Sequence, residues 1–72
     1  MMILSLNRRE ILVLDQGERV AYVYADWCEH EACVINIRSD EDRPEVAALL
    51  NDYWPVLEIV WPEDLEVATV TI

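Results

Sequence analysis

The segment from Asp26 to Cys33 (D-W-C-E-H-E-A-C) holds two thiols, an imidazole and several carboxylates, the most varied side-chain chemistry of the chain. Zinc is held by four ligands in a tetrahedron, most often Cys and His. Cys28, His30 and Cys33 would supply three ligands and Asp26 a fourth. Familiar zinc sites add a second, distant pair of ligands, and this chain has neither a third cysteine nor a second histidine. The spacing therefore favours no bound metal, and we expect no cofactor.

The same two cysteines could instead form a disulfide. If residues 29–32 form a hairpin loop, Cys28 and Cys33 face each other across two strands at the separation that a disulfide requires. No signal peptide is visible, because the apolar start at Met1–Leu6 lacks a basic region, so we expect a cytoplasmic protein. The cytosol keeps thiols reduced, which favours Cys33 as a small buried side chain and Cys28 as a loop residue. A small metal- or redox-responsive module built on Cys28, His30 and Cys33 is an alternative.

We do not expect an enzyme. The hydroxyl groups outside the tyrosines are few, and none lies in a recognisable nucleophile setting: Ser5, Ser39, Thr69 and Thr71. Gly17 is the only glycine, which excludes a glycine-rich loop for phosphate.

Negative charge is the dominant property of the chain. Fifteen acidic residues stand against five arginines and no lysine, for a net charge of −10 on 72 residues. Such a body repels nucleic acid and anionic membranes and is attracted to basic clefts. We therefore expect no direct contact with nucleic acid or membrane, and a partner protein with a basic, nucleic-acid-binding cleft. Carboxylates can take the place of phosphates as partners of arginine and lysine there.

The candidate partner-binding residues fall into three groups. The first two are acidic stretches, and the third surrounds a tryptophan at an expected hairpin tip, a residue type that often dominates binding energy. The groups are Asp40, Glu41, Asp42 and Glu45; Glu63, Asp64 and Glu66; and Trp27 with Glu29 and Glu31.

One helix is expected between Ser39 and Trp54. Its apolar residues recur at i, i+3, i+4 and i+7, the spacing of a single buried face: Val46, Leu49, Leu50 and Tyr53. Asp42 or Arg43 would be the N-cap, because Pro44 suits the first turn. Pro55 ends the helix.

Strand-like segments lie on both sides of this helix. They are Met2–Leu6, Glu10–Asp15, Glu18–Trp27 and Ala32–Arg38 before it, and Val56–Trp61 and Leu65–Ile72 after it. The first reads as a buried strand and the second as covered on both faces, whereas the fourth would bury Cys33, Ile35 and Ile37. A tight turn is expected at Gln16-Gly17.

The prediction is a single α+β domain over residues 1–72. Its element order is β-β-β-β-α-β-β, a small antiparallel sheet with one helix packed on one face. An unpaired edge such as Val67–Ile72 would favour a homodimer or the addition of a partner strand.

The start of the chain, M-I-L-S at Met2–Ser5 with Glu10 and Leu12, resembles the opening of the carbon storage regulator family of small RNA-binding repressors. The resemblance covers about the first 14 residues. It implies a homodimeric regulator that binds RNA or a protein, with Arg8 and Arg9 as the residues of interest. The glycines and the alanine-proline segment of that family are absent here, and its basic character is replaced by acid.

In size and charge the chain is similar to the small, acidic, lysine-free inhibitors of host defence that phages encode, such as anti-CRISPR proteins, and to nucleic-acid mimics. The expected function is therefore that of an acidic inhibitor.

Overall fold

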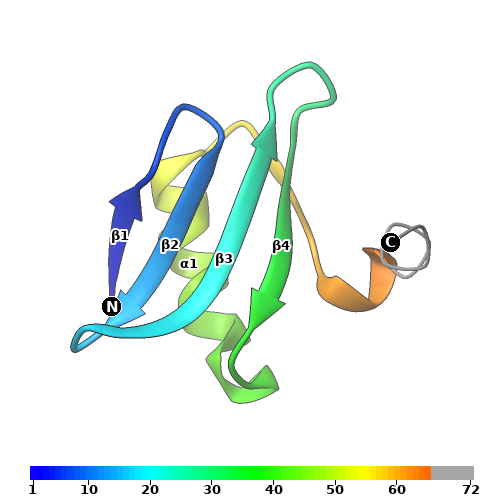
Figure 1. Cartoon of the computed structure of the whole chain (residues 1–72). Coiled ribbons are helices and arrows are strands. Elements are labelled where there is room, and N and C mark those ends of the chain that lie inside the picture. Colours follow the sequence, from blue (N-terminus) through cyan, green and yellow to red (C-terminus); the bar gives the residue numbers. More distant parts are fainter. Residues whose placement is uncertain (66–72) are drawn as a thin grey trace.

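The computed structural model describes residues 1–65 and builds them into one sheet backed by one helix (Figure 1). The elements are β1 (Met2–Ser5), β2 (Glu10–Asp15), β3 (Glu18–Asp26), β4 (Glu31–Ile37), the 3-10 helix η1 (Asp40–Asp42), α1 (Arg43–Tyr53), β5 (Glu58–Val60) and the 3-10 helix η2 (Pro62–Leu65). The sixth strand predicted at Leu65–Ile72 falls almost entirely on residues outside the described part, and Leu65 itself ends η2.

The sheet has the order β1-β2-β3-β4-β5, with antiparallel pairing from β1 to β4 and parallel pairing of β4 with β5. The α+β class and the helix on one face are confirmed. The fifth strand differs from the expected antiparallel arrangement because α1 carries the chain back to the end at which β4 began. Such a crossover makes the next strand parallel to the one before it.

The β2–β3 hairpin turns at Gln16 and Gly17, as predicted. Both residues have positive φ, 51° and 82°. Positive φ at both central positions matches the twist of the two flanking strands, and Asp15 and Glu18 pair directly across the turn.

Two bulges decide which side chains of β3 and β4 face the core. Val20 is the extra residue where the β2–β3 register shifts, so Val20 and Ala21 are both buried. Ile35 is the extra residue where the β3–β4 register shifts. The prediction for the fourth strand is therefore wrong in part: Val34 is fully buried and Ile35 is 45% exposed. An inserted residue reverses the alternation on either side of it.

The helix packs on the sheet through fewer residues than the sequence pattern indicated. Val46 and Leu50 are fully buried and Leu49 is partly buried against the core, whereas Tyr53 is 48% exposed. Tyr53 was expected on the buried face; it ends the helix, and Trp54 takes the buried place there instead. Within the described residues no helix is long and apolar enough to span a bilayer.

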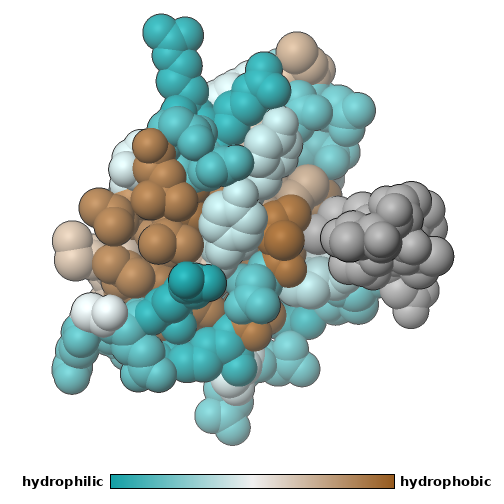
Figure 2. All heavy atoms as spheres, in the orientation of Figure 1, coloured by the Kyte–Doolittle hydropathy of each residue, from teal (hydrophilic) through white to brown (hydrophobic). Residues whose placement is uncertain are grey.

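The face of the sheet opposite α1 is not covered by any described element and is apolar along β1 and β2. Cross-strand pairs place Met2 beside Leu14 and Leu4 beside Leu12 on this face. Figure 2 shows the apolar side chains gathered over these two strands. The prediction that β1 is buried is wrong, since Met2 is 59% and Leu4 44% exposed. The prediction that β2 is covered on both faces is also wrong, since Leu12 and Leu14 are only partly buried and no described element packs on this face.

Candidate acidic binding surface

Arg43 joins the two acidic stretches at one end of the molecule. It lies at the start of α1, where its Nη1 and Nη2 donate to Glu63 Oε1 and Oε2 at 2.6 and 2.5 Å. Its Nε donates to Asp40 Oδ1 at 3.1 Å, and its guanidinium lies 4.9 Å from the ring centre of Trp61. Residues twenty positions apart in the sequence, in α1 and η2, are therefore held together by one side chain.

This fork holds the carboxylate of Glu63 ionised. Hydrogen bonds from Arg43, followed by one from the backbone N–H of Glu63, lower the pKa of Glu63 from 4.5 to about 2. A charge-assisted bidentate contact also fixes the orientation of both planar groups.

Arg38, at the end of β4, gathers a second set of carboxylates. Its Nε and Nη2 donate to Asp42 Oδ2 and Oδ1 at 3.1 and 2.9 Å, and the hydrogen bonds lower the pKa of Asp42. Asp15 and Glu18 of the β2–β3 hairpin lie 3.8 and 3.4 Å from the same guanidinium. Asp42 is the N-cap residue of α1, one of the two positions predicted, but it makes no side-chain cap bond, because its carboxylate is engaged by Arg38.

We call the combined surface the acidic end, made of Asp40, Glu41, Asp42, Glu45, Glu63 and Asp64. Glu41, Glu45 and Asp64 make no ion pair with any residue between 1 and 65. Their charge is therefore offered to solvent or to a partner. Glu66, predicted as part of the second stretch, lies outside the described residues.

The third predicted group is far from the acidic end. Trp27, Glu29 and Glu31 lie at the tip of the β3–β4 hairpin, at the opposite end of β4 from η1 (Figure 1). Trp27 is 43% exposed and its ring meets Trp54 edge-on at 6.1 Å. Its placement as an exposed aromatic side chain is confirmed, and the structure does not join it to the two acidic stretches.

The thiols and the imidazole do not converge. Cys33 lies opposite Tyr24 in the sheet, whereas Cys28 is in the turn, where the carboxylate of Asp26 accepts its backbone N–H at 3.0 Å. The alternative in which Cys28 and Cys33 face each other across the hairpin is wrong, because Cys33 lies opposite Tyr24. Both cysteines are free; Cys28 is an exposed loop residue, as expected, and Cys33 is only partly buried. His30 occupies the turn with φ of 57°. Among the described residues no three potential ligands are placed to hold a metal ion.

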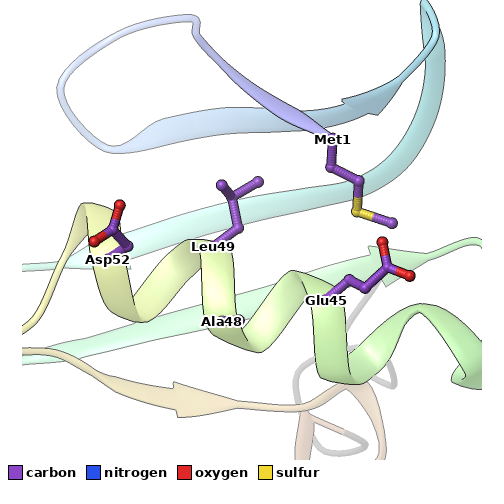
Figure 3. A pocket seen from close by; sticks show the side chains of 5 residues that line it. All are labelled: Met1, Glu45, Ala48, Leu49 and Asp52. Carbon is purple, nitrogen blue, oxygen red and sulfur yellow. The ribbon is translucent and has the colours of Figure 1, made fainter.

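A hollow of about 510 Å³ lies between the first residue of the chain and α1, and the sequence analysis did not identify it. Glu45 and Asp52 stand along its length, and its apolar lining is Met1, Ala48 and Leu49 (Figure 3). The available signal was the seven-residue spacing of the two acids, which places both on one face of a helix. The hollow begins at Glu45, so it continues the acidic end along α1.

No family model matches the chain, and no curated protein or solved structure matches it either.

Proposed function

We propose that the protein is an inhibitor that docks its acidic end on a basic, nucleic-acid-binding surface of another protein and occupies it in place of nucleic acid. The observation that carries this proposal is the convergence of the two acidic stretches through Arg43. A run of exposed acids along a flexible chain would lose conformational entropy on binding. Carboxylates fixed on α1, η1 and η2 lose less of it, which favours affinity.

The chemistry of such a surface matches that of a phosphate backbone. Carboxylates accept charge-assisted hydrogen bonds from arginine and lysine as phosphate oxygens do. The net charge of −10 would steer the protein toward a basic cleft, with an association rate that falls as salt is added. By size and charge, we place it with phage-type inhibitors of host defence, and nucleic-acid-handling defence proteins are the first partners to test.

The test is capture of the partner at low and at high salt, with two variants of equal charge. The first variant, Glu41→Gln/Glu45→Gln/Asp64→Asn, removes the carboxylates of the acidic end that make no ion pair with described residues. The control, Glu10→Gln/Glu29→Gln/Glu58→Gln, removes the same charge from the sheet and the hairpin tip.

The proposal expects a nucleic-acid-binding protein to be captured at low salt, released at high salt, lost with the first variant and retained with the control. Nucleic acid should displace the inhibitor from that protein. Equal loss with both variants would contradict the proposal, because capture would then depend on total charge or on the hairpin tip as much as on the acidic end. Capture of RNA itself would contradict the proposal and favour a regulator of the carbon storage type.

A further inference from the structure

The outer edge of the sheet at β1 has backbone groups that no strand within residues 1–65 pairs. The N–H of Leu6 donates to the carbonyl of Glu10 at 2.9 Å, which continues the β1–β2 ladder. In an antiparallel ladder, successive residues alternate between bonding inward and pointing away. The N–H and C=O groups of Ile3 and Ser5 therefore point outward, and no strand within residues 1–65 pairs with them.

Although β1 is short, this edge lacks three other features that usually block strand addition. β1 carries no charged residue and no proline, and its register with β2 is free of bulges. Met2 and Leu4 add exposed apolar surface beside the edge. Such an edge is a template for another strand.

The hollow beside this edge determines which side chains an added strand would need. Met1, which precedes β1, lines the hollow together with Glu45 and Asp52 of α1 (Figure 3). Along an added strand, alternate side chains would lie on the apolar face next to Met2 and Leu4, and on the helix side toward the two carboxylates. The first set must be apolar. The second set must be cationic, with an aliphatic stem to cover Leu49.

We propose that β1 accepts an extended segment of a partner protein as an added strand, in which apolar residues alternate with lysine or arginine that reach Glu45 and Asp52. This inference rests on the proposed function and specifies which side chains the basic partner would present at β1. A second copy of this chain fits less well. Pairing β1 with its own copy about a two-fold axis would bring both hollows, with four carboxylates, to the same side of the joined sheet.

The probe is a short peptide alternating valine and lysine, and its control has the same composition with the valines and lysines in separate blocks. Hydrogen exchange of the backbone amides, followed by NMR, reports strand addition directly. The alternating peptide should slow exchange of the Ile3 and Ser5 amides at least tenfold, as expected when an exposed N–H enters a ladder. The block peptide should not.

Two pairs of variants separate the backbone from the charge. Ser5→Pro removes an outward N–H that β2 does not use, whereas Ser5→Ala keeps it. We expect binding to be lost with the first and retained with the second. Unchanged exchange of the Leu4 and Leu12 amides, which bond across β1 and β2, shows that β1 stays paired in both variants. Glu45→Gln/Asp52→Asn should weaken binding roughly tenfold, and Glu18→Gln/Glu58→Gln, with equal charge, should change it little.

Unchanged exchange at Ile3 and Ser5 with saturating peptide would overturn the inference. Slow exchange of these amides before any peptide is added would also overturn it, because the edge would then already be occupied in the free protein. Light scattering would show whether a second copy of the chain occupies it. If Ser5→Pro still captures the partner and the acidic-end variant does not, the edge inference fails and the proposed function stands. If no basic partner is captured in a salt-sensitive manner, the proposed function fails. The peptide experiment then tests by itself whether β1 accepts an added strand.

Discussion

Two arginine side chains organise five carboxylates. Arg38 holds Asp42 in a fork and lies near Asp15 and Glu18, and Arg43 holds Asp40 and Glu63. Each arginine is thus surrounded by more negative charge than it neutralises. The carboxylates are fixed in position while most of their charge remains, which is the arrangement that a surface competing with phosphate needs.

Replacing Arg43 by glutamine should return the pKa of Glu63 from about 2 toward 4.5. The pKa is depressed in the folded state, so the stabilising contribution is complete above pH 4.5 and is lost as the pH falls toward 2. The Arg43→Gln variant should therefore show a smaller loss of stability over this range. An NMR titration of the Glu63 carboxyl carbon measures the pKa. The control Arg38→Gln should leave the pKa of Glu63 unchanged and raise the pKa of Asp42. A pKa of Glu63 that stays at about 2 without Arg43 would contradict the assignment.

Cys28 should be alkylated faster than Cys33. Cys28 is exposed, whereas burial, followed by the negative charge of Glu31, raises the pKa of the Cys33 thiol. The thiolate is the reactive form, so less of Cys33 is reactive at neutral pH. Mass spectrometry of iodoacetamide adducts over time gives both rates. Glu31→Gln should speed the reaction of Cys33 and leave Cys28 unaffected, and equal initial rates would show that Cys33 is more open than the structure indicates.

At the scale of the elements, the two bulges explain why the observed core residues differ from those that regular alternation along the strands predicts. Ile35 is the larger side chain and the better candidate by pattern, yet it is exposed, and the smaller Val34 beside it is fully buried. The inserted residue also allows Ile37 to return to the core side, where it pairs with Ala21.

Alanine substitution at Val34 should destabilise the protein more than alanine substitution at Ile35, although isoleucine is the larger side chain. Val34→Ala should lower the free energy of unfolding by about 1–3 kcal/mol, because it removes two methyl groups from a closed site and leaves a cavity. Ile35→Ala should change it by about 0.5 kcal/mol or less, as at other exposed positions. Urea unfolding followed by tryptophan fluorescence measures both. A larger loss for Ile35 would mean that β4 has the regular alternation after all.

The elements themselves were largely predictable from local pattern. Turn chemistry at Gln16-Gly17 and the apolar spacing of Val46 and Leu50 are local signals, and both hold. The bulges were not predictable, since an extra residue leaves no mark where two apolar residues follow each other, as at Val20-Ala21 and Val34-Ile35. The contact of Arg43 with Glu63 depends on the path of the chain after α1, which no short-range signal contains.

At the scale of the whole molecule, negative charge works against the compact state. The chain is confined to about 33 × 24 × 21 Å, so its carboxylates repel one another across the whole body when salt is low. The Debye length is about 30 Å at 0.01 M salt and about 3 Å at 1 M, which spans this size.

Added sodium chloride should therefore raise the urea midpoint of unfolding. Repulsion among exposed carboxylates is screened strongly, whereas the short forks of Arg38 and Arg43 are screened less. The Glu41→Gln/Asp64→Asn variant should have a higher midpoint than the wild type at low salt and a smaller response to salt. A midpoint that falls with salt would mean that ion pairs, not repulsion, dominate the electrostatic balance.

The parallel pairing of β4 with β5 also sets an order of assembly. Strands β1 to β4 each contact a neighbour in the sequence, whereas β5 pairs only after η1 and α1 have brought the chain back along the sheet. Closing that longer loop costs entropy before its contacts stabilise the fold, so we expect β5 and η2 to join last. Glu63 then reaches Arg43 only in the final step. A partly folded chain would thus carry the net charge of the native protein without the completed acidic end, so a partner that recognises this surface would bind only the fully folded molecule.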